Sequence, residues 1–125
     1  MTILSVDDST TIRRIVKRSC EELGHTVLEA ADGAAALATL AEKSSEVSLV
    51  ILDWNMPGMT GLEVLKAVKS DPRTKNIVVM MLTSEADMNF VKEALAAGAQ
   101  NYLTKPFDQK MLALKIQESM AMISA

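Results

Sequence analysis

Short apolar runs alternate with helix-like segments along the whole sequence, and this alternation is the strongest constraint on the fold. Five runs rich in branched side chains are predicted as strands, namely Thr2 to Val6, His25 to Ala30, Val47 to Leu52, Ile77 to Leu82 and Gln100 to Leu103. The segments between them place apolar residues at the helical period of 3.6. Runs that are apolar on both faces are typical of parallel strands covered by crossover helices. The sequence therefore predicts a doubly wound (βα)₅ sandwich with a five-stranded parallel sheet.

The helix ends carry their own markers. Glycines that end helices and polar residues that cap the following ones are predicted at Gly24, Gly98, Asp32 and Thr60. The pair Asp71-Pro72 should end the third helix, because proline cannot continue one. The last helix is predicted from Asp108 to about Ser124. We expect residues 1–125 to form one domain with no output domain attached.

Composition excludes several classes of function. No apolar run approaches the roughly 18 residues that a membrane span needs, so no membrane association is expected. A net charge of −3 argues against nucleic-acid binding, which needs a dense array of Lys and Arg. The single cysteine, Cys20, has no internal disulfide partner and sits at helical spacing from apolar residues, which predicts a core thiol in a reducing compartment. We therefore expect a cytoplasmic protein.

Polar residues follow the predicted strands where ligands bind in open α/β sheets, beyond the carboxyl ends. The strand ends present the residues Asp7-Asp8, Asp53, Thr83-Ser84 and Lys105-Pro106. Three carboxylates brought together there would raise one another's pKa unless a cation neutralised them. Oxygen ligands without clustered His or Cys favour a hard ion, so the sequence predicts a Mg²⁺ site.

A carboxylate can also act as a nucleophile and form an aspartyl phosphate, and Asp53 is the best placed of the three. The ammonium group of Lys105 would then stabilise the charge on the transferred phosphoryl oxygens together with Mg²⁺. Thr83 would donate its hydroxyl to the new phosphate. Because an X-Pro bond in a tight turn can be cis, the peptide bond Lys105-Pro106 is a candidate cis bond that aims the lysine at the site.

Each of these residues also has a simpler structural role. Asp7-Asp8 is as good a candidate for capping the first helix, and Asp53 begins a stretch of turn-forming residues. Thr83 is suited to cap the fourth helix, and Lys105 to be a solvated surface charge. Taken singly, the structural roles are favoured. Taken together they are not, because four separate strand ends would have to present these groups to one crevice by coincidence.

These motifs, with Phe107 after Lys105-Pro106, resemble the receiver domains of response regulators over the whole chain, and the run from Asp53 to Pro57 is especially similar to the chemotaxis members. The resemblance implies a flavodoxin-like strand order of 2-1-3-4-5. It also implies that Mg²⁺ is held by Asp7, Asp8, Asp53 and the backbone carbonyl of Asn55. Thr83 and Lys105 would bind the phosphoryl oxygens. The activity implied is limited to the protein's own phosphorylation and dephosphorylation.

The resemblance further implies a switch in which the aromatic ring of Tyr102 turns inward when Thr83 is drawn toward the phosphate. Asn55 and Glu85 would flank the attacking water and give a short-lived phosphoryl group. The surface of the fourth helix, fifth strand and fifth helix would then bind a target. The fourth helix carries more apolar residues than one buried face requires, namely Met88, Phe90, Val91 and Leu95. A packed strand tyrosine and scattered exposed apolar residues remain the alternatives.

The partners implied by the resemblance are proteins. A CheA-like histidine kinase would donate the phosphoryl group, a flagellar switch protein or similar target would bind the phosphorylated form, and a phosphatase would shorten its lifetime. The protein itself is expected to be a monomer. A basic stripe on the first helix is a candidate kinase-docking surface, although a solvated helix face explains it equally well: Arg13, Arg14, Lys17 and Arg18.

Other functions remain open to different degrees. A single-domain phosphorelay intermediate or phosphate sink would share every site residue and differ only in its partners. A flavodoxin-like cofactor-binding module would place its phosphate loop where Ser9-Thr10-Thr11 lies, but this loop lacks glycine and leaves the three aspartates unexplained. A dehalogenase-type phosphatase would need Asp-x-Asp after the first strand, whereas Asp7 and Asp8 are adjacent. No P-loop motif is present.

Overall fold

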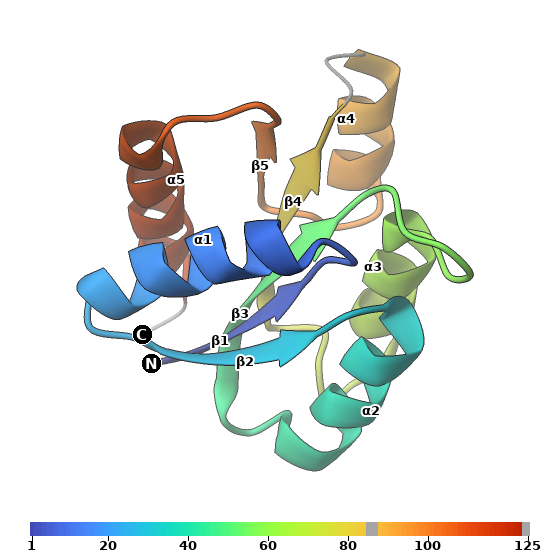
Figure 1. Cartoon of the computed structure of the whole chain (residues 1–125). Coiled ribbons are helices and arrows are strands. Elements are labelled where there is room, and N and C mark those ends of the chain that lie inside the picture. Colours follow the sequence, from blue (N-terminus) through green and yellow to red (C-terminus); the bar gives the residue numbers. More distant parts are fainter. Residues whose placement is uncertain (85–87, 124–125) are drawn as a thin grey trace.

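The computed structural model describes residues 1–84 and 88–123, and of Met88 only the backbone. Strands and helices alternate strictly along the described residues (Figure 1). The strands are β1 (Thr2–Val6), β2 (Thr26–Ala30), β3 (Val47–Asp53), β4 (Val78–Thr83) and β5 (Asn101–Thr104). The helices are α1 (Thr10–Glu22), α2 (Gly33–Lys43), α3 (Gly61–Ser70), α4 (Met88–Ala96) and α5 (Gln109–Ala121).

The five strands form one parallel sheet in the order β2-β1-β3-β4-β5, so the predicted fold class and strand order are confirmed. Strands β3, β4 and β5 each end one residue later than predicted, so Asp53 and Thr83 are the last residues of their strands. Strands β2, β4 and β5 also begin one residue later than predicted. Helix α5 ends at Ala121, a few residues before the predicted end. No glycine or proline marks the end of this helix, so the sequence placed it only approximately.

Helices cover both faces of the sheet, with α1 and α5 on one face and α2, α3 and α4 on the other (Figure 1). One buried apolar cluster joins α1 and α5 to the sheet and includes Val16, Cys20, Leu112 and Ile116. A second cluster joins the opposite face to α2, α3 and α4 and includes Leu40, Val64, Leu65 and Ala94. Alternate residues of each strand contribute to the two clusters, because successive side chains of a strand point to opposite faces.

The predicted residues cap and end the helices. Asp32 caps α2 by accepting a hydrogen bond from Ala35 N, and Thr60 forms a reciprocal capping box with Glu63 at the start of α3. Gly24 and Gly98 have positive φ angles of 89° and 110°, which only glycine adopts without strain. Each glycine follows a helix, as the sequence predicted.

The single cysteine lies in the core. Cys20 is fully buried between α1 and the sheet, and burial raises the pKa of its thiol to about 12. The prediction of a core thiol is confirmed. Among the described residues, no helix is long and apolar enough to cross a bilayer.

Candidate functional site

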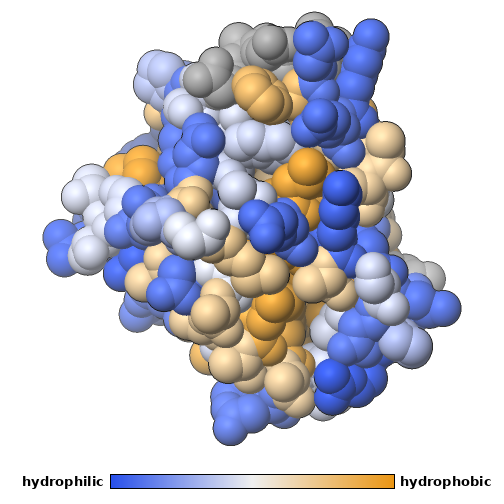
Figure 2. Space-filling view, turned by 90° about the vertical axis from the view of Figure 1, so that its right-hand side faces the viewer, coloured by the Kyte–Doolittle hydropathy of each residue, from blue (hydrophilic) through white to orange (hydrophobic). Residues whose placement is uncertain are grey.

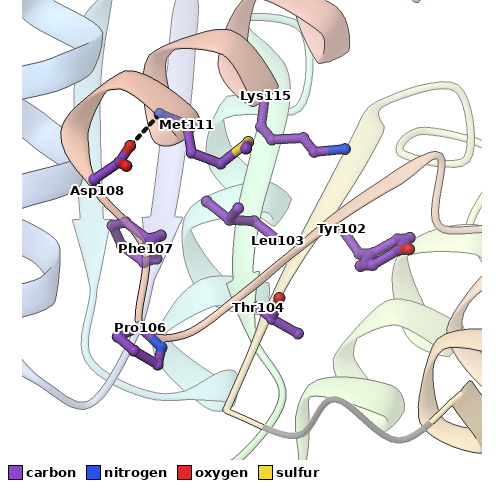
Figure 3. A pocket seen from close by; sticks show the side chains of 8 residues that line it. All are labelled: Tyr102, Leu103, Thr104, Pro106, Phe107, Asp108, Met111 and Lys115. Carbon is purple, nitrogen blue, oxygen red and sulfur yellow. Dashed lines mark hydrogen bonds between the residues drawn. The ribbon is translucent and has the colours of Figure 1, made fainter.

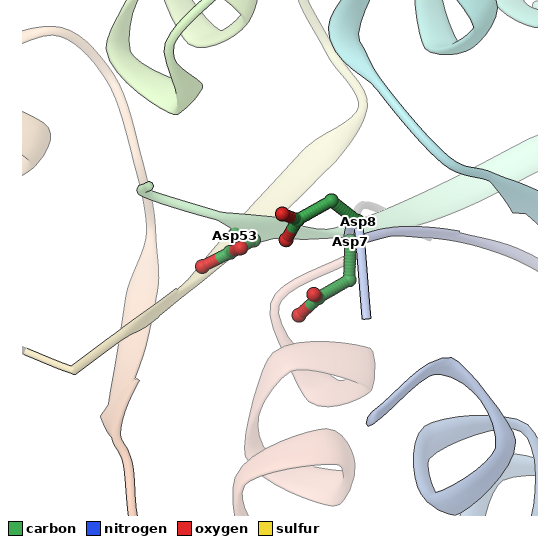
Figure 4. Close-up of side chains that lie close together, drawn as sticks. All are labelled: Asp7, Asp8 and Asp53. Carbon is green, nitrogen blue, oxygen red and sulfur yellow. The ribbon is translucent and has the colours of Figure 1, made fainter. Parts of the chain in front are cut away.

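Three carboxylates meet where β1 and β3 end (Figure 4). One oxygen from each of Asp7, Asp8 and Asp53 lies within 4.8 Å of the others. The side chains differ in their surroundings, because Asp7 is 1% exposed and Asp53 is 3% exposed, whereas Asp8 faces solvent. The carboxyl ends of neighbouring parallel strands lie at one edge of the sheet, which is why residues so distant in sequence come together.

Lys105 joins the two buried carboxylates. Its ammonium nitrogen lies 3.0 Å from Oδ2 of Asp7 and 3.2 Å from Oδ1 of Asp53. The backbone N–H of Lys105 donates a 2.6 Å hydrogen bond to the carbonyl oxygen of Thr83, which holds the loop after β5 against the end of β4. The peptide bond Lys105-Pro106 is cis, as the sequence suggested. The alternative of a solvated surface lysine is therefore wrong.

The acidic cluster perturbs the ionisation of Asp53. Burial and the nearby charge of Asp7 raise the pKa of its carboxyl group to about 6, even though Lys105 acts in the opposite direction. Burial alone would lower the pKa of Lys105, but its hydrogen bond to Asp7 and the charges of both carboxylates outweigh this and raise it. The site therefore holds more negative charge than one lysine neutralises.

A divalent cation fits this set of residues. All three clustered side chains offer carboxylate oxygens, the ligands that hard cations such as Mg²⁺ prefer. Burial and the charge of Asp7 together raise the pKa of Asp53, and a bound cation would lower it by stabilising the ionised carboxylate. Asp8 faces solvent and leaves one side of the cluster open, which suits an ion that keeps several of its waters.

Asp7 is held by four separate hydrogen bonds. Its N–H donates to the carbonyl of Ala30, its Oδ1 accepts from Ser9 N, and its Oδ2 accepts from Lys105. Its own carbonyl oxygen accepts a 2.5 Å bond from the guanidinium of Arg13. The cap of α1 is Ser9, whose hydroxyl accepts from Ile12 N, so the interpretation of Asp7-Asp8 as the helix cap is wrong.

The sequence missed this role of Arg13, which it assigned to a solvent-facing basic stripe. Two members of that stripe, Arg14 and Arg18, are exposed, but the Arg13 side chain is only 15% exposed and turns toward β1 and β2. The spacing of basic residues along a helix could not reveal this, because the contact depends on how α1 crosses the sheet. The sequence also did not reveal the role of Gly61. A Cβ atom on Gly61 would lie 2.2 Å from the carbonyl oxygen of Asp53, so the start of α3 rests directly on the end of β3.

Thr83 and Asn55 lie at the rim of the cluster. Thr83 is buried at the end of β4, the strand next to β3. Asn55 is exposed, donates from its side chain to the hydroxyl of Ser84 at 3.3 Å, and donates from its backbone to Asp53 at 3.4 Å. The last contact is the one expected of a turn-forming aspartate, so that structural role of Asp53 coexists with its place in the cluster. Glu85, the predicted partner of Asn55, lies outside the described residues.

Tyr102 lines a pocket of about 400 Å³ between β5, the loop after it and α5 (Figure 3). The side chain of Lys115 extends from α5 toward it, and its ammonium nitrogen lies 5.6 Å from the centre of the tyrosine ring. This is a cation–π distance. Tyr102 is half-buried and also packs against the core on the α4 side of the sheet.

The prediction of excess apolar residues on the fourth helix is confirmed only at Leu95, which is 47% exposed. Val91 is buried, and Phe90 packs against Trp54 with 5.4 Å between ring centres. The side chain of Met88 lies outside the described part of the chain. Figure 2 shows hydrophobic surface (orange) between hydrophilic side chains (blue) on the side of the molecule that carries α2, α3 and α4. Leu62 and Ala97 line a shallow groove between α3 and α4.

Comparison with known proteins gives a consistent result. The family model described as response regulator receiver domain matches residues 3–117. The chemotaxis protein CheY of Pseudomonas aeruginosa is 44% identical over 119 residues, with 94% of each chain covered. The chemotaxis protein CheY1 of Helicobacter pylori is 43% identical over 118 residues, again with 94% of each chain covered.

Solved structures agree with the sequence comparison. The chemotaxis response regulator CheY4 of Vibrio cholerae superposes with a TM-score of 0.87 at 39% identity, covering 94% of this chain and 97% of that one. A putative response regulator from Chloroflexus aurantiacus superposes with a TM-score of 0.88 at 31% identity, covering 96% and 97%. The sequence motifs, the strand order and both comparisons lead to one conclusion: the chain belongs to the family of response regulator receiver domains.

Proposed function

We propose that this receiver accepts a phosphoryl group on Asp53 from the phosphohistidine of a histidine kinase, as the response regulator of a two-component system. One observation carries the proposal: Lys105 bridges the buried carboxylates of Asp7 and Asp53 at the carboxyl edge of the sheet. A buried nucleophile, a second carboxylate and an ammonium group within hydrogen-bond distance are the parts that phosphoryl transfer to an aspartate requires.

The chemistry follows from the positions of these groups. An oxygen of Asp53 attacks phosphorus as the P–N bond of the phosphohistidine breaks, and the leaving imidazole takes up a proton. The ammonium of Lys105 and the hydroxyl of Thr83 stabilise the phosphoryl oxygens, where negative charge is spread in the transition state. Mg²⁺, bound by Asp7, Asp8, Asp53 and the backbone carbonyl of Asn55, would neutralise the remaining charge.

Phosphorylation would then change the surface around Tyr102. The phosphoryl group adds about −1.5 to −2 charges next to Thr83, and drawing that hydroxyl inward frees space at the end of β4 for the aromatic ring. The neighbouring surface of α4, β5 and α5 includes the pocket lined by Tyr102 and Lys115, which is large enough to receive side chains of a partner. The target therefore binds the phosphorylated state more tightly than the free state.

The physiological setting proposed is chemotaxis in the cytoplasm. The support is that the two relatives named above are both called chemotaxis proteins and match this chain over nearly their whole length. The partners are then a CheA-like kinase, a target such as a flagellar switch protein, and a phosphatase. Residues 1–125 would act as a monomeric receiver, with Asn55 and Glu85 setting a phosphoryl lifetime of seconds to minutes. A phosphorelay or phosphate-sink role uses the same site with different partners.

Intact mass spectrometry tests the proposal directly. The wild-type protein and Asp53→Asn are incubated with Mg²⁺ and acetyl phosphate, and the mass is followed over time. A single phosphoryl adduct that forms and decays in the wild type alone supports the mechanism. If neither protein gains mass, even with a phosphorylated kinase as donor, the crevice has another ligand.

A further inference from the structure

Arg13 makes contacts that its place in the sequence does not suggest. Its Nη1 atom donates a 2.5 Å hydrogen bond to the carbonyl oxygen of Asp7, and its Nε atom lies 3.3 Å from Oε1 of Glu29 on β2. Lys17, one turn later on α1, lies 3.9 Å from the other oxygen of Glu29. Arg13 therefore ties α1 to both β1 and β2 at the edge of the sheet where the carboxylates gather.

The hydrogen bond to Asp7 acts on the peptide group that joins the two N-terminal carboxylates. The carbonyl oxygen of Asp7 belongs to the peptide unit leading to Asp8, and this unit is planar and rigid. Holding its oxygen fixes the direction in which the chain leaves β1. It therefore fixes the position of Asp8, which faces solvent and whose side chain, unlike that of Asp7, has no hydrogen bond or ion pair with any of residues 1–84 and 88–123.

We infer that Arg13 is a positioning residue for the divalent-cation site, acting through the peptide between Asp7 and Asp8 and not through contact with the ion. The inference rests on the proposed function, because it needs that site to bind a cation. Groups that orient the ligands of a metal site contribute strongly to affinity, and losing one typically weakens binding about 10- to 100-fold.

The positive charge of Arg13 weakens cation binding, whereas its positioning role strengthens it. A guanidinium near a cation site repels the ion, so removing it would tighten binding if charge were the dominant effect. Glu29 compensates much of this charge at 3.3 Å, and the side chain of Arg13 contacts a backbone carbonyl, not a clustered carboxylate. We therefore expect the loss of positioning to outweigh the relief of repulsion. The sign of the change in affinity separates the two effects.

The test is the dissociation constant for Mg²⁺. Trp54 is the only tryptophan of the chain and directly follows Asp53, so its fluorescence is a built-in probe of the site. Binding of Mn²⁺ measured by electron paramagnetic resonance gives a second readout that does not depend on the fluorophore. Both are measured without any phosphodonor, so the result does not depend on phosphorylation activity.

Three variants distinguish positioning from charge. In Arg13→Gln we expect the Mg²⁺ dissociation constant to rise on the order of tenfold. In Arg13→Lys we expect a smaller rise, because an ammonium group can still donate to the carbonyl oxygen of Asp7 but cannot hold Asp7 and Glu29 together with the geometry of the guanidinium. The matched control is Arg14→Gln, which removes the same charge from the next, exposed position of α1 and should leave the constant unchanged.

The outcomes are separable. Tighter binding in Arg13→Gln, or wild-type binding in both Arg13 variants, overturns the positioning role. If Arg13→Gln does not fold, the two single variants Arg13→Lys and Glu29→Gln replace it in the test. The first exchanges the guanidinium for an ammonium group, and the second removes the carboxylate that orients the guanidinium. Each disturbs the positioning while a positive charge stays at residue 13. Failure of the wild type itself to bind Mg²⁺ or Mn²⁺ overturns the proposed metal-dependent function and not the geometry of Arg13 alone.

Discussion

The ammonium nitrogen of Lys105 lies 3.2 Å from Oδ1 of Asp53, although 52 residues separate the two in sequence. The contact exists because β3 and β5 end at the same edge of the sheet and the loop after β5 is bonded to the end of β4. It places a fixed positive charge beside the proposed phosphoacceptor before any phosphodonor arrives. Such preorganised charge needs little rearrangement during the reaction.

Replacing Lys105 should slow the phosphorylation of Asp53 and raise the pKa of its carboxyl group. In Lys105→Met we expect the rate of phosphorylation by acetyl phosphate to fall about 100-fold, the typical effect of removing one stabilising donor from the transition state. The pKa of Asp53 should also rise above its wild-type value, because Lys105 lowers it. Mass spectrometry gives the rate, and ¹³C-carboxylate NMR gives the pKa. Wild-type rates in Lys105→Met would contradict the role assigned to the ammonium group.

Asp53→Asn should stabilise the cation-free protein in a pH-dependent way. Burial and the charge of Asp7 raise the pKa of Asp53 from 3.8 to about 6, so the folded state holds this proton more tightly than the unfolded chain. The stability due to that proton is complete below about pH 4 and is lost as the pH rises through about 6. Above that range the variant should be more stable than the wild type by about 1 to 3 kcal/mol.

Urea unfolding in the presence of a chelator, at several pH values, measures this difference. The gain in stability should vanish at low pH, where both proteins are uncharged at this position. A gain of the same size at every pH would mean that the carboxylate charge is not its origin.

Asp8→Asn should behave differently from Asp53→Asn, with little effect on stability and a large effect on Mg²⁺ binding. Asp8 faces solvent, so removing its charge should change the stability of the cation-free protein by less than about 0.5 kcal/mol. Its proposed role is to bind Mg²⁺, so the dissociation constant measured by Trp54 fluorescence should rise at least about tenfold. Unchanged Mg²⁺ affinity in this variant would place the ion elsewhere.

Gly61 is predicted to be intolerant of any side chain. A Cβ atom there would meet the carbonyl oxygen of Asp53 at 2.2 Å and the Cα atom of Trp54 at 2.8 Å, and neither backbone atom can move without displacing the end of β3. Gly61→Ala should therefore cost about 1 to 3 kcal/mol and weaken Mg²⁺ binding. The control is Gly58→Asn, in the loop that leads to α3.

Gly58 has a positive φ of 76° but open space around the missing side chain, and asparagine tolerates this backbone conformation. Thermal unfolding of both variants gives the comparison. Equal losses of stability would show that the close contact at Gly61 relaxes easily.

Tyr102 is the only tyrosine of the chain, so a fluorinated tyrosine gives one ¹⁹F NMR signal. On phosphorylation with acetyl phosphate we expect this signal to shift toward that of a buried ring and to return as the phosphoryl group is lost. In Thr83→Ala the shift should be reduced even when the mass shows full phosphorylation, because the hydroxyl links the phosphate to the ring. An identical shift in Thr83→Ala would exclude that link.

Much of the site was predictable because parallel strands place their carboxyl ends together. Once Asp7, Asp53, Thr83 and Lys105 were each assigned to a strand end, their meeting followed from topology, and an error of one residue in a boundary did not matter. The capping residues were equally predictable, since a cap depends on neighbours within four residues.

The contacts that the sequence did not reveal depend on how whole elements cross. Arg13 reaches Asp7 and Glu29 only because α1 lies over β1 and β2, and Gly61 is required only because α3 begins against β3. Neither follows from periodicity or from residue type. The assignment of Asp7-Asp8 as a helix cap failed for a local reason: Ser9, the next residue, was an equally good candidate and took the position.

The buried thiol of Cys20 has a consequence for how this molecule meets its chemical environment. With a pKa of about 12 the group carries almost no thiolate at neutral pH, and the thiolate is the form that peroxides, disulfides and alkylating reagents attack. Oxidants therefore react slowly with the only cysteine of the chain. A single reporter cysteine introduced on the surface can be labelled selectively, with the native thiol left in place.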